Sequence, residues 1–248
     1  MEKKWKTSIA AITATSGLFL TAALASDIQW DYQAPHEWQA LHQDFAACAG
    51  SEQSPINLVE QEAHTVKPAE IEYHWTAFTP DVVNNGHTIQ VNTGGNGGHV
   101  MLDGTRYDLI QFHFHAGSEH LIDGQQEPLE IHFVHASENG DLLVIGQFVQ
   151  EGGANETIET LWNLIPEEGV AITGDAAIDQ AALINTGSPF FRYKGSLTTP
   201  PCSEIVTWQV YAEPISVSKE QIEAFTALYS GNFRPVQEVG RRYVLFWR

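Results

Sequence analysis

The chain has 248 residues, of which 43% are hydrophobic and 17% are charged, and its formal net charge is -19 at pH 7. It is long enough to bury one full-sized core, and we expect one domain after any targeting segment. Nucleic acids and anionic membrane surfaces are bound through basic patches, so this acidic balance excludes both as expected partners.

The first residues have the layout of a secretory signal. Three lysines lie within the first six residues, and an apolar run follows that ends at Ala23-Leu24-Ala25. A basic region, an apolar region and a small-x-small end are typical of a cleaved signal peptide. A transmembrane anchor is the alternative, but threonines and serines dilute the run and no charged stop-transfer cluster follows it. We predict a signal at 1–25, a domain at 26–248, no membrane insertion after cleavage, and a periplasmic or secreted protein.

Two cysteines, Cys48 and Cys202, lie in the exported part of the chain. An oxidising compartment favours a disulfide over two buried free thiols. A pair so far apart in sequence could supply at most two ligands to a metal. We therefore predict a Cys48–Cys202 disulfide.

Short strands separated by turns dominate the rest of the sequence, and helices are few. Residues 155–165 and 218–229 have apolar side chains at helical spacing, and Ser218 with Gln221 forms a capping box. These patterns predict a mainly β (α+β) single domain on a large, mostly antiparallel sheet with short peripheral helices. Strands are expected within 79–92, on both sides of the turn at Asn84-Asn85-Gly86, and at 108–115, 128–135 and 141–150.

The stretch from Leu109 to His120 carries three histidines and a glutamate inside an apolar run. Side chains alternate between the two faces of a strand, so His113 and His115 share one face, and Phe112 and Phe114 share the other. Two imidazoles therefore converge. Strand histidines are often only hydrogen-bonded core residues, so the pair alone is a weak signal.

The next strand adds a third histidine. Glu130, His132 and Val134 lie on one face of it, and His135 lies on the opposite face. If the two strands are antiparallel neighbours through the turn at Asp123-Gly124, His132 lies beside the first pair. Three histidines with an open fourth position are typical of catalytic zinc.

A cupin, which is another β architecture, is the main alternative. Its metal motif also reads His-x-His followed after three residues by Glu, as His115 and Glu119 do. Glu119 would then bind the metal directly, and a redox ion would be expected. The cupin pattern needs its last histidine on a distant second motif, and the sequence has no histidine after His135. Spacing alone leaves both readings open.

The segment 195–208, "GSLTTPPCSEIVTW", carries a family resemblance. Together with "QSPINL" (53–58), "NNGH" (84–87), "QFHFH" (111–115), "GSEH" (117–120) and "EIHFVH" (130–135), it closely resembles the α-class carbonic anhydrases. The resemblance extends from about Trp30 to the C-terminal strand, and the signal, the cysteine pair and a short "DGQQEP" loop are similar to the bacterial, exported branch. It implies a central twisted sheet of about ten strands and a zinc enzyme that hydrates carbon dioxide reversibly to bicarbonate and a proton.

The resemblance also assigns roles around the metal. His113, His115 and His132 correspond to the Zn2+ ligands. Gln111, Glu130 and a backbone carbonyl correspond to the groups that orient the ligating rings. Thr198 corresponds to a threonine whose hydroxyl donates to Glu119 and orients the attacking hydroxide, and Thr199 to a neighbour that contacts bicarbonate. His87 corresponds to the proton shuttle.

Two further groups of residues follow from the resemblance. Carbon dioxide is apolar and needs a dry wall beside the metal, whereas the proton needs a polar path to bulk water. In isolation, each wall residue would more simply be read as core. The wall is Val134, Val144, Leu197, Val206 and Trp208, and the proton path is Tyr32, Asn85 and Gln90.

Carbon dioxide, bicarbonate and water are the expected partners, and the resemblance implies inhibition by sulfonamides and small anions and leaves a homodimer open. A catalytically silent member of the same fold, or an exported zinc-holding protein, is the alternative function. Silent relatives have typically lost ligand histidines, and a zinc store would instead use histidine-rich tracts. This chain keeps all three histidines, so the sequence favours the enzyme.

Overall fold

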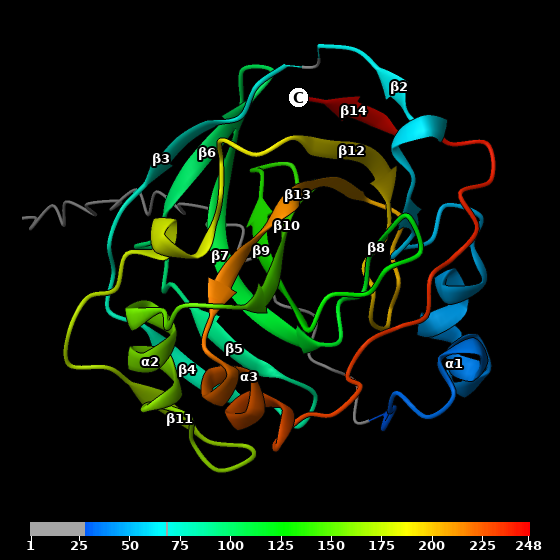
Figure 1. Ribbon diagram of the computed structural model, residues 1–248. Coiled ribbons are helices and arrows are strands. Elements are labelled where there is room, and N and C mark those ends of the chain that lie inside the picture. The colour runs from blue at the N-terminus through cyan, green and yellow to red at the C-terminus, as the bar shows by residue number, and fades with distance from the viewer. Residues whose placement is uncertain (1–27, 68) are drawn as a thin grey trace, which may run out of the picture.

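A large twisted sheet forms the centre of the molecule in the computed structural model, which describes residues 28–67 and 69–248 (Figure 1). Its twelve strands run in the order β11-β4-β5-β7-β9-β10-β13-β12-β14-β2, with β6 paired to β7 and β3 paired to β6. The strands are β2 (His64–Thr65), β3 (Glu72–Trp75), β4 (Asp81–Asn84), β5 (Ile89–Asn92), β6 (Gly98–Leu102), β7 (Thr105–Ala116), β9 (Leu129–Ala136), β10 (Leu142–Glu151), β11 (Ala171–Thr173), β12 (Phe190–Gly195), β13 (Val206–Val217) and β14 (Leu245–Trp247).

Most strand pairs are antiparallel, as predicted. Two pairs within the sheet, β10–β13 and β14–β2, are parallel. A separate pair, β1 (Asn57–Leu58) and β8 (Leu121–Ile122), is also parallel. The mainly β fold is therefore confirmed, with twelve strands in the main sheet where about ten were expected.

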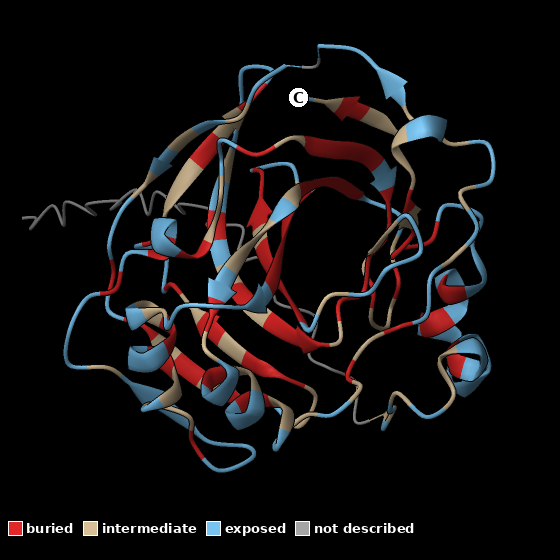
Figure 2. Ribbon diagram, in the orientation of Figure 1, coloured by how far each residue is buried: buried red, intermediate tan, exposed pale blue. Residues whose placement is uncertain are grey.

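The register of the central strands confirms the predicted neighbours. β4 and β5 form the expected hairpin around Asn85-Gly86. β7 and β9 are antiparallel, and His113 lies directly opposite His132. β10 is buried along most of its length because it lies between β9 and β13. Figure 2 shows the buried residues concentrated along these central strands.

Helices are short and peripheral. Ser218 and Gln221 form the predicted capping box at the start of α3, and the side chain of Asn155 caps α2. The helical segments are η1 (Pro35–Glu37), α1 (Trp38–Leu41), η2 (Gln43–Ala49), η3 (Glu60–Glu62), α2 (Glu156–Trp162), η4 (Gln180–Leu183) and α3 (Lys219–Thr226).

Apolar clusters cover both faces of the sheet. On one face, Phe114 of β7 contacts Trp162 at the end of α2 and Phe225 of α3, with ring centroids 4.7 and 5.8 Å apart. The other face carries a second cluster that includes Val144 and Trp208. Since Phe114 faces the helices, the alternation along β7 directs His113 and His115 to the second cluster's side of the sheet.

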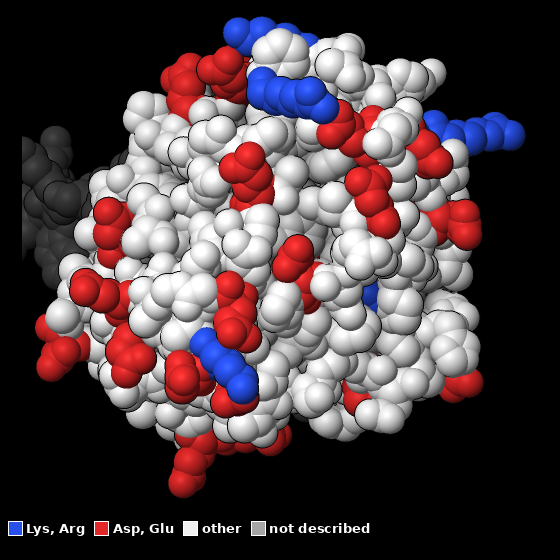
Figure 3. Space-filling view, in the orientation of Figure 1, with Lys and Arg blue, Asp and Glu red and all other residues white. Residues whose placement is uncertain are grey.

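Acidic side chains are spread over the surface in Figure 3, with few basic ones between them. Within residues 28–67 and 69–248, no helix is both long and apolar enough to cross a membrane. The predicted signal at 1–25 lies outside the described residues.

Candidate metal centre

Three histidines converge on the face of the sheet opposite α2 and α3. His113 and His115 come from β7, and His132 comes from the facing position of β9. One ring nitrogen from each lies within 4.8 Å of the other two. The side chains that the sequence predicted as a cluster are therefore brought together by strand alternation and by the β7–β9 register.

Each imidazole is held by a hydrogen bond at its outer nitrogen. His113 Nδ1 donates to Gln111 Oε1 at 2.9 Å, and His132 Nε2 donates to Glu130 Oε1 at 2.9 Å. His115 Nδ1 donates to the carbonyl oxygen of Asn232 at 2.7 Å. Because all three partners are oxygen acceptors, the outer nitrogens carry the protons. The lone pairs of His113 Nε2, His115 Nε2 and His132 Nδ1 are left to face one another.

The inner nitrogens meet the requirements of a metal site. Among the described residues, His115 Nε2 is buried and has no hydrogen-bond partner. A buried polar atom without a partner is costly, and a bound cation would remove that cost. Three neutral imidazole nitrogens are the ligand set of many catalytic zinc sites. The residues present therefore fit a zinc ion.

The histidine pKa values agree with this chemistry. Burial, together with repulsion from the other two rings, holds the pKa of His113 well below its ordinary value. Burial also lowers the pKa of His115. Burial alone would lower the pKa of His132, but the carboxylate of Glu130 outweighs it and the net shift is upward. Glu130 thus makes His132 the most basic of the three imidazoles.

Glu130 is the centre of a fully buried hydrogen-bond network. Its Oε2 accepts from the backbone N–H groups of Glu119 and His120 at 2.8 and 2.9 Å. Its Oε1 accepts from His120 Nδ1 at 2.8 Å as well as from His132. Burial by itself raises a carboxyl pKa, but His120 and His132 outweigh it and hold the pKa of Glu130 well below its usual range. The group is therefore ionised and fixed in place.

Glu119 lies beside the three histidines with one oxygen committed and one facing the rings. Its Oε1 accepts from the backbone N–H of Arg234 at 2.8 Å. Its Oε2 lies 3.5 Å from His115 Nε2 and 3.7 Å from His132 Nδ1, and has no hydrogen-bond partner in the described chain. The described residues show no hydrogen bond from Thr198 to Glu119, although the resemblance implies one.

A cavity of about 130 Å³ opens beside the histidines. It brings together residues from the N-terminal segment, the β4–β5 hairpin, β7 and the loop after β12. Gln90 lies opposite His113 in the β5–β7 register. The predicted residues that line the cavity are Tyr32, Asn85, His87, Gln90, Gln111, His113, His115 and Thr199.

His87 lines this cavity and is half-buried. The side chain of Asn85 accepts hydrogen bonds from the backbone N–H groups of His87 and Thr88, at 3.0 and 2.9 Å, and so fixes the turn. The His87 ring stacks on Trp30 with centroids 3.8 Å apart. Burial lowers the pKa of His87 below its ordinary value, whereas Glu168 and Asp31 oppose that shift.

The predicted apolar wall forms a continuous row across three strands. Val134 of β9 is paired with Val144 of β10, and Val144 is paired with Trp208 of β13. Val206 and Leu197 belong to the same cluster. The Trp208 ring lies 4.8 Å from that of His132, so the row borders the histidines directly.

The sequence did not single out three residues that the structure places in the site. Asn232 bonds His115 through its carbonyl, and its side-chain amide donates to the carbonyl oxygens of His87 and Phe114, each at 3.0 Å. Trp30 provides the surface for His87. Gly146 lies opposite His132, and a Cβ there would lie 2.9 Å from Glu130 Oε1. A glycine inside a buried strand run indicates such a close approach, whereas Asn232 and Trp30 carry no local signal.

The predicted disulfide is present. Cys48 and Cys202 are bonded across a separation of 154 residues. Cys202 lies four residues after Thr198 and belongs to a small buried cluster with Trp38 and Phe45. The bond therefore links the N-terminal segment to the loop that carries Thr198 and Thr199.

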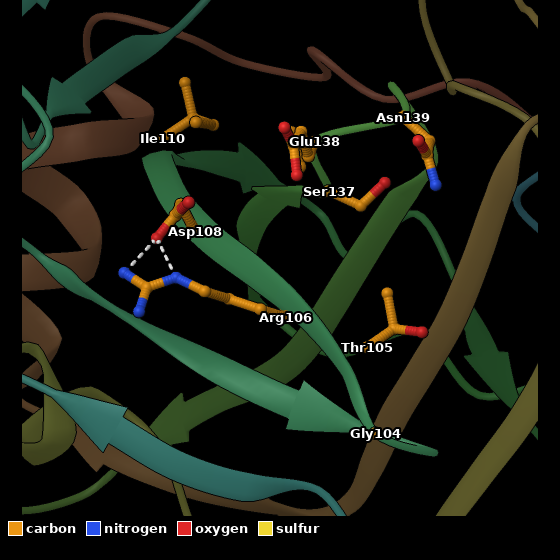
Figure 4. Close-up of a pocket in the computed structure, with 9 residues that line it drawn as sticks. Gly104, Thr105, Arg106, Asp108, Ile110, Ser137, Glu138 and Asn139 are labelled. Carbon is orange, nitrogen blue, oxygen red and sulfur yellow. Dashed lines mark hydrogen bonds and ion pairs between the residues drawn. The ribbon is translucent and has the colours of Figure 1, made fainter.

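A larger cavity of about 670 Å³ lies elsewhere, between the start of β7 and the β9–β10 turn (Figure 4). Its charged side chains are Arg106, Asp108 and Glu138, and Arg106 is paired with Asp108. It has no histidine or cysteine among its lining residues. Although this cavity is larger than the one beside the histidines, its lining does not form a competing metal site.

Comparisons with known proteins agree with this geometry. Residues 33–247 match the family described as eukaryotic-type carbonic anhydrase. A carbonic anhydrase of Pectobacterium atrosepticum is 38% identical, covering 91% of this chain and 93% of its own. The α-carbonic anhydrase of Thermovibrio ammonificans, solved with sulfanilamide, is 41% identical with a TM-score of 0.82, over 88% and 99% of the two chains. A carbonic anhydrase of Chlamydomonas reinhardtii, solved with acetazolamide, is 33% identical with a TM-score of 0.78, over 88% and 99%. The chain belongs to the α-class, or eukaryotic-type, carbonic anhydrase family, enzymes whose general reaction is the hydration of carbon dioxide.

Proposed function

We propose that this protein is a zinc-dependent carbonic anhydrase that converts carbon dioxide and water reversibly to bicarbonate and a proton. The observation that carries the proposal is the convergence of His113 Nε2, His115 Nε2 and His132 Nδ1, each ring being held by a hydrogen bond at its other nitrogen. Bound there, zinc would lower the pKa of its water to about 7, a value known for carbonic anhydrases, and supply hydroxide at neutral pH.

The residues around the histidines hold them for this task. Gln111, the carbonyl of Asn232 and Glu130 fix the tautomer and direction of the three rings. Thr198 and Glu119 orient the attacking group in our proposal. Thr198 is buried one position before Thr199, which lines the cavity beside the histidines, and Glu119 places a carboxylate oxygen 3.5 Å from His115 Nε2.

The apolar row beside the histidines is proposed to receive carbon dioxide. The substrate has no charge to pair, so a surface made by Val134, Val144 and Trp208 is suited to it. Val206 and Leu197 complete that surface. Thr199 lines the neighbouring polar cavity and is proposed to contact the bicarbonate product.

The polar cavity is proposed as the route of the proton. His87 accepts it on an imidazole nitrogen and releases it to buffer, and Tyr32, Asn85 and Gln90 line the water path. Burial lowers the pKa of His87 below its ordinary value, which favours release once the proton has arrived.

Inhibition follows from the same site. The Thermovibrio and Chlamydomonas relatives were solved with sulfanilamide and with acetazolamide, respectively. We propose that sulfonamides and small anions also bind at the three histidines of this chain.

Stopped-flow hydration of carbon dioxide, with zinc measured on the same sample, tests the proposal. We expect about one zinc per chain and hydration activity that disappears when zinc is removed and returns when it is restored. Full zinc occupancy without hydration would instead indicate a silent family member or a zinc-holding protein. A protein that holds no zinc and is inactive after zinc addition would contradict the proposal.

Glu119→Gln separates the zinc site from a cupin-type site. If Glu119 only positions other groups, the variant keeps its zinc and hydrates carbon dioxide about 10- to 100-fold more slowly, since the charge beside the ligand nitrogens is lost. If Glu119 is itself a ligand, the variant loses metal. Zinc content and hydration rate are measured on one preparation.

Glu138→Gln is the matched control, since Glu138 is exposed at the distant cavity and should leave both quantities unchanged. A metal-depleted Glu119→Gln protein, combined with activity of the unaltered protein on iron or manganese, would overturn the zinc assignment.

His87→Ala tests the proton route. A proton shuttle acts after the attack on carbon dioxide, so its loss slows the maximal rate and not the attack itself. We therefore expect the maximal rate in weak buffer to fall about tenfold or more. The second-order rate constant for carbon dioxide should stay nearly unchanged, and added imidazole should restore part of the maximal rate. Buffer-dependent stopped-flow kinetics measure all three.

His36→Ala, at an exposed position of η1, is the control and should behave like the unaltered protein. An unchanged maximal rate of His87→Ala at low buffer would mean that another group exports the proton.

We also propose that residues 1–25 are removed during export and that the mature protein is periplasmic or secreted. Cleavage removes three lysines and Glu2, so the formal charge becomes -21. N-terminal sequencing of the exported protein should begin at Ser26. A retained Met1 in that protein would contradict cleavage.

A further inference from the structure

We propose that the protein binds small organic oxyanions in a second pocket, separate from the histidines. The pocket has a volume of about 420 Å³ and is formed mainly by β12 and the segment 241–245 that leads into β14. This volume is within the usual range of small-molecule sites. Four cationic side chains line it: Arg192, Lys194, Arg241 and Arg242.

This concentration of positive charge is unexpected in so acidic a protein. The sequence has 12 lysines and arginines, three of them within the first six residues, so four of the remaining nine line one pocket. Elsewhere on the described surface, each exposed cation lies beside a carboxylate, whereas none of the pocket's four has a carboxylate within 4.0 Å among the described residues. The four cations that have carboxylate partners are Lys67, Arg106, Lys219 and Arg248.

Two of the cations form a fixed positive floor. Arg192 donates to Gln209 Oε1 and to the carbonyl of Ala69, and Arg242 donates to the carbonyl oxygens of Val239 and Lys194, among others. All of these acceptors are neutral, and the carboxylates of Glu52 and Glu204 act on Arg242 only from beyond ion-pair distance. Both side chains are also held in place before any ligand arrives, which reduces the entropy lost on binding.

The other two cations, Lys194 and Arg241, have N–H donors that are not used by the described residues. Lys194 Nζ donates to the hydroxyl of Thr207 at 2.6 Å and keeps two further N–H groups. Arg241 is exposed and makes no hydrogen bond or ion pair with the described residues. Glu52 also lines the pocket, but its carboxylate is not within 4.0 Å of any of the four cations. An oxyanion that reaches both Lys194 and Arg241 would gain charge-assisted hydrogen bonds.

The uncharged residues that line the pocket indicate which group the ligand carries besides its oxyanion. Tyr243 and Leu245 present apolar surface, and Tyr243 is 72% exposed, so its ring is accessible for stacking. A ligand with a doubly charged oxyanion on an aromatic body matches both features. The chemical class is therefore an aromatic phosphate monoester.

Calorimetric titration of phenyl phosphate into the mature, zinc-loaded protein at low salt tests this site. We expect saturable one-site binding that weakens as salt is raised. Arg241→Gln and Lys194→Gln should each weaken it about tenfold, since each removes a charge-assisted hydrogen bond. Lys219→Gln removes an exposed charge that does not line the pocket and is already paired with Glu223. This variant should leave the affinity unchanged. Inorganic phosphate should bind more weakly than phenyl phosphate, because it lacks the aromatic body.

Several outcomes would overturn the site. No saturable binding, or equal weakening by Lys219→Gln, would mean that the cations attract anions only diffusely. An affinity unchanged in the Arg241→Gln/Lys194→Gln double variant would place phenyl phosphate elsewhere, including at the zinc. Equal binding of inorganic and phenyl phosphate would contradict the aromatic body. Both substituted positions are exposed, and thermal unfolding of each variant verifies that the fold is intact. Tyr193 is left unchanged because its hydroxyl bonds His120 in the network around Glu130.

Discussion

Replacing His132 with alanine is expected to remove zinc and hydration activity together. His132 Nδ1 is one of three nitrogens that converge within 4.8 Å, and it is the ligand whose ring Glu130 holds directly. With two imidazoles left, the site has too few ligands for a catalytic zinc, which uses three protein ligands. We expect zinc content to fall to near zero and the hydration rate to approach that of uncatalysed solution. Metal analysis and stopped-flow hydration on one sample measure both.

The same variant must be shown to be folded, because His132 is buried between β7 and β10. Circular dichroism and thermal unfolding provide that measurement. His99→Ala, on β6 away from the site, is the control and should keep its zinc and its activity. A folded His132→Ala protein with full zinc and full activity would show that the metal centre is assigned to the wrong residues.

Reduction of the Cys48–Cys202 disulfide is expected to lower stability substantially. The bond closes a loop of 154 residues, so it restricts the unfolded chain strongly. Chain-entropy reasoning gives an upper value of about 5 kcal/mol, and measured disulfides contribute about 2–4 kcal/mol. For a domain of this size, the typical range corresponds to a fall in Tm of about 4–16 °C. Thermal unfolding with and without reductant measures it.

The loop that carries Thr198 and Thr199 is expected to loosen as well, since Cys202 is its covalent attachment to the N-terminal segment. Each cysteine keeps a hydrogen bond to its backbone after reduction, because the side chain of Gln53 donates to the carbonyl of Cys202 and that of Arg234 donates to the carbonyl of Cys48. The Cys48→Ser/Cys202→Ser double variant should match the reduced protein and should not respond to reductant. Two titratable thiols in native exported protein would contradict the bond.

The sequence predicted the elements of the site because their signals are local. Alternation along 108–115 and 128–135 placed His113, His115 and His132 on common faces, and the structure confirms both the strands and their antiparallel pairing. The hairpin at Asn85-Gly86 and the capping box at Ser218 were likewise predicted from neighbouring residues, and both are present. The family motifs supplied the residue roles, which remain proposals.

The tertiary structure decided which atoms meet, because those contacts join segments far apart in the chain. The resemblance implied a backbone carbonyl beside the ligating rings, but only the structure shows that it is the carbonyl of Asn232, which bonds His115 across 117 positions. Trp30 stacks on His87, and the backbone N–H of Arg234 donates to Glu119 Oε1.

The same distinction applies to the second pocket. Arg192 and Lys194 are separated by about 50 residues from Arg241 and Arg242, and only the pairing of β12 with β14 gathers the four charges. The sequence by itself determined the strands, the faces on which the histidines lie and the family, since side-chain alternation and short motifs depend on adjacent residues. Only the tertiary structure decided the register, the hydrogen-bond partners and the gathering of the cations, because these depend on long-range packing that adjacent residues do not encode.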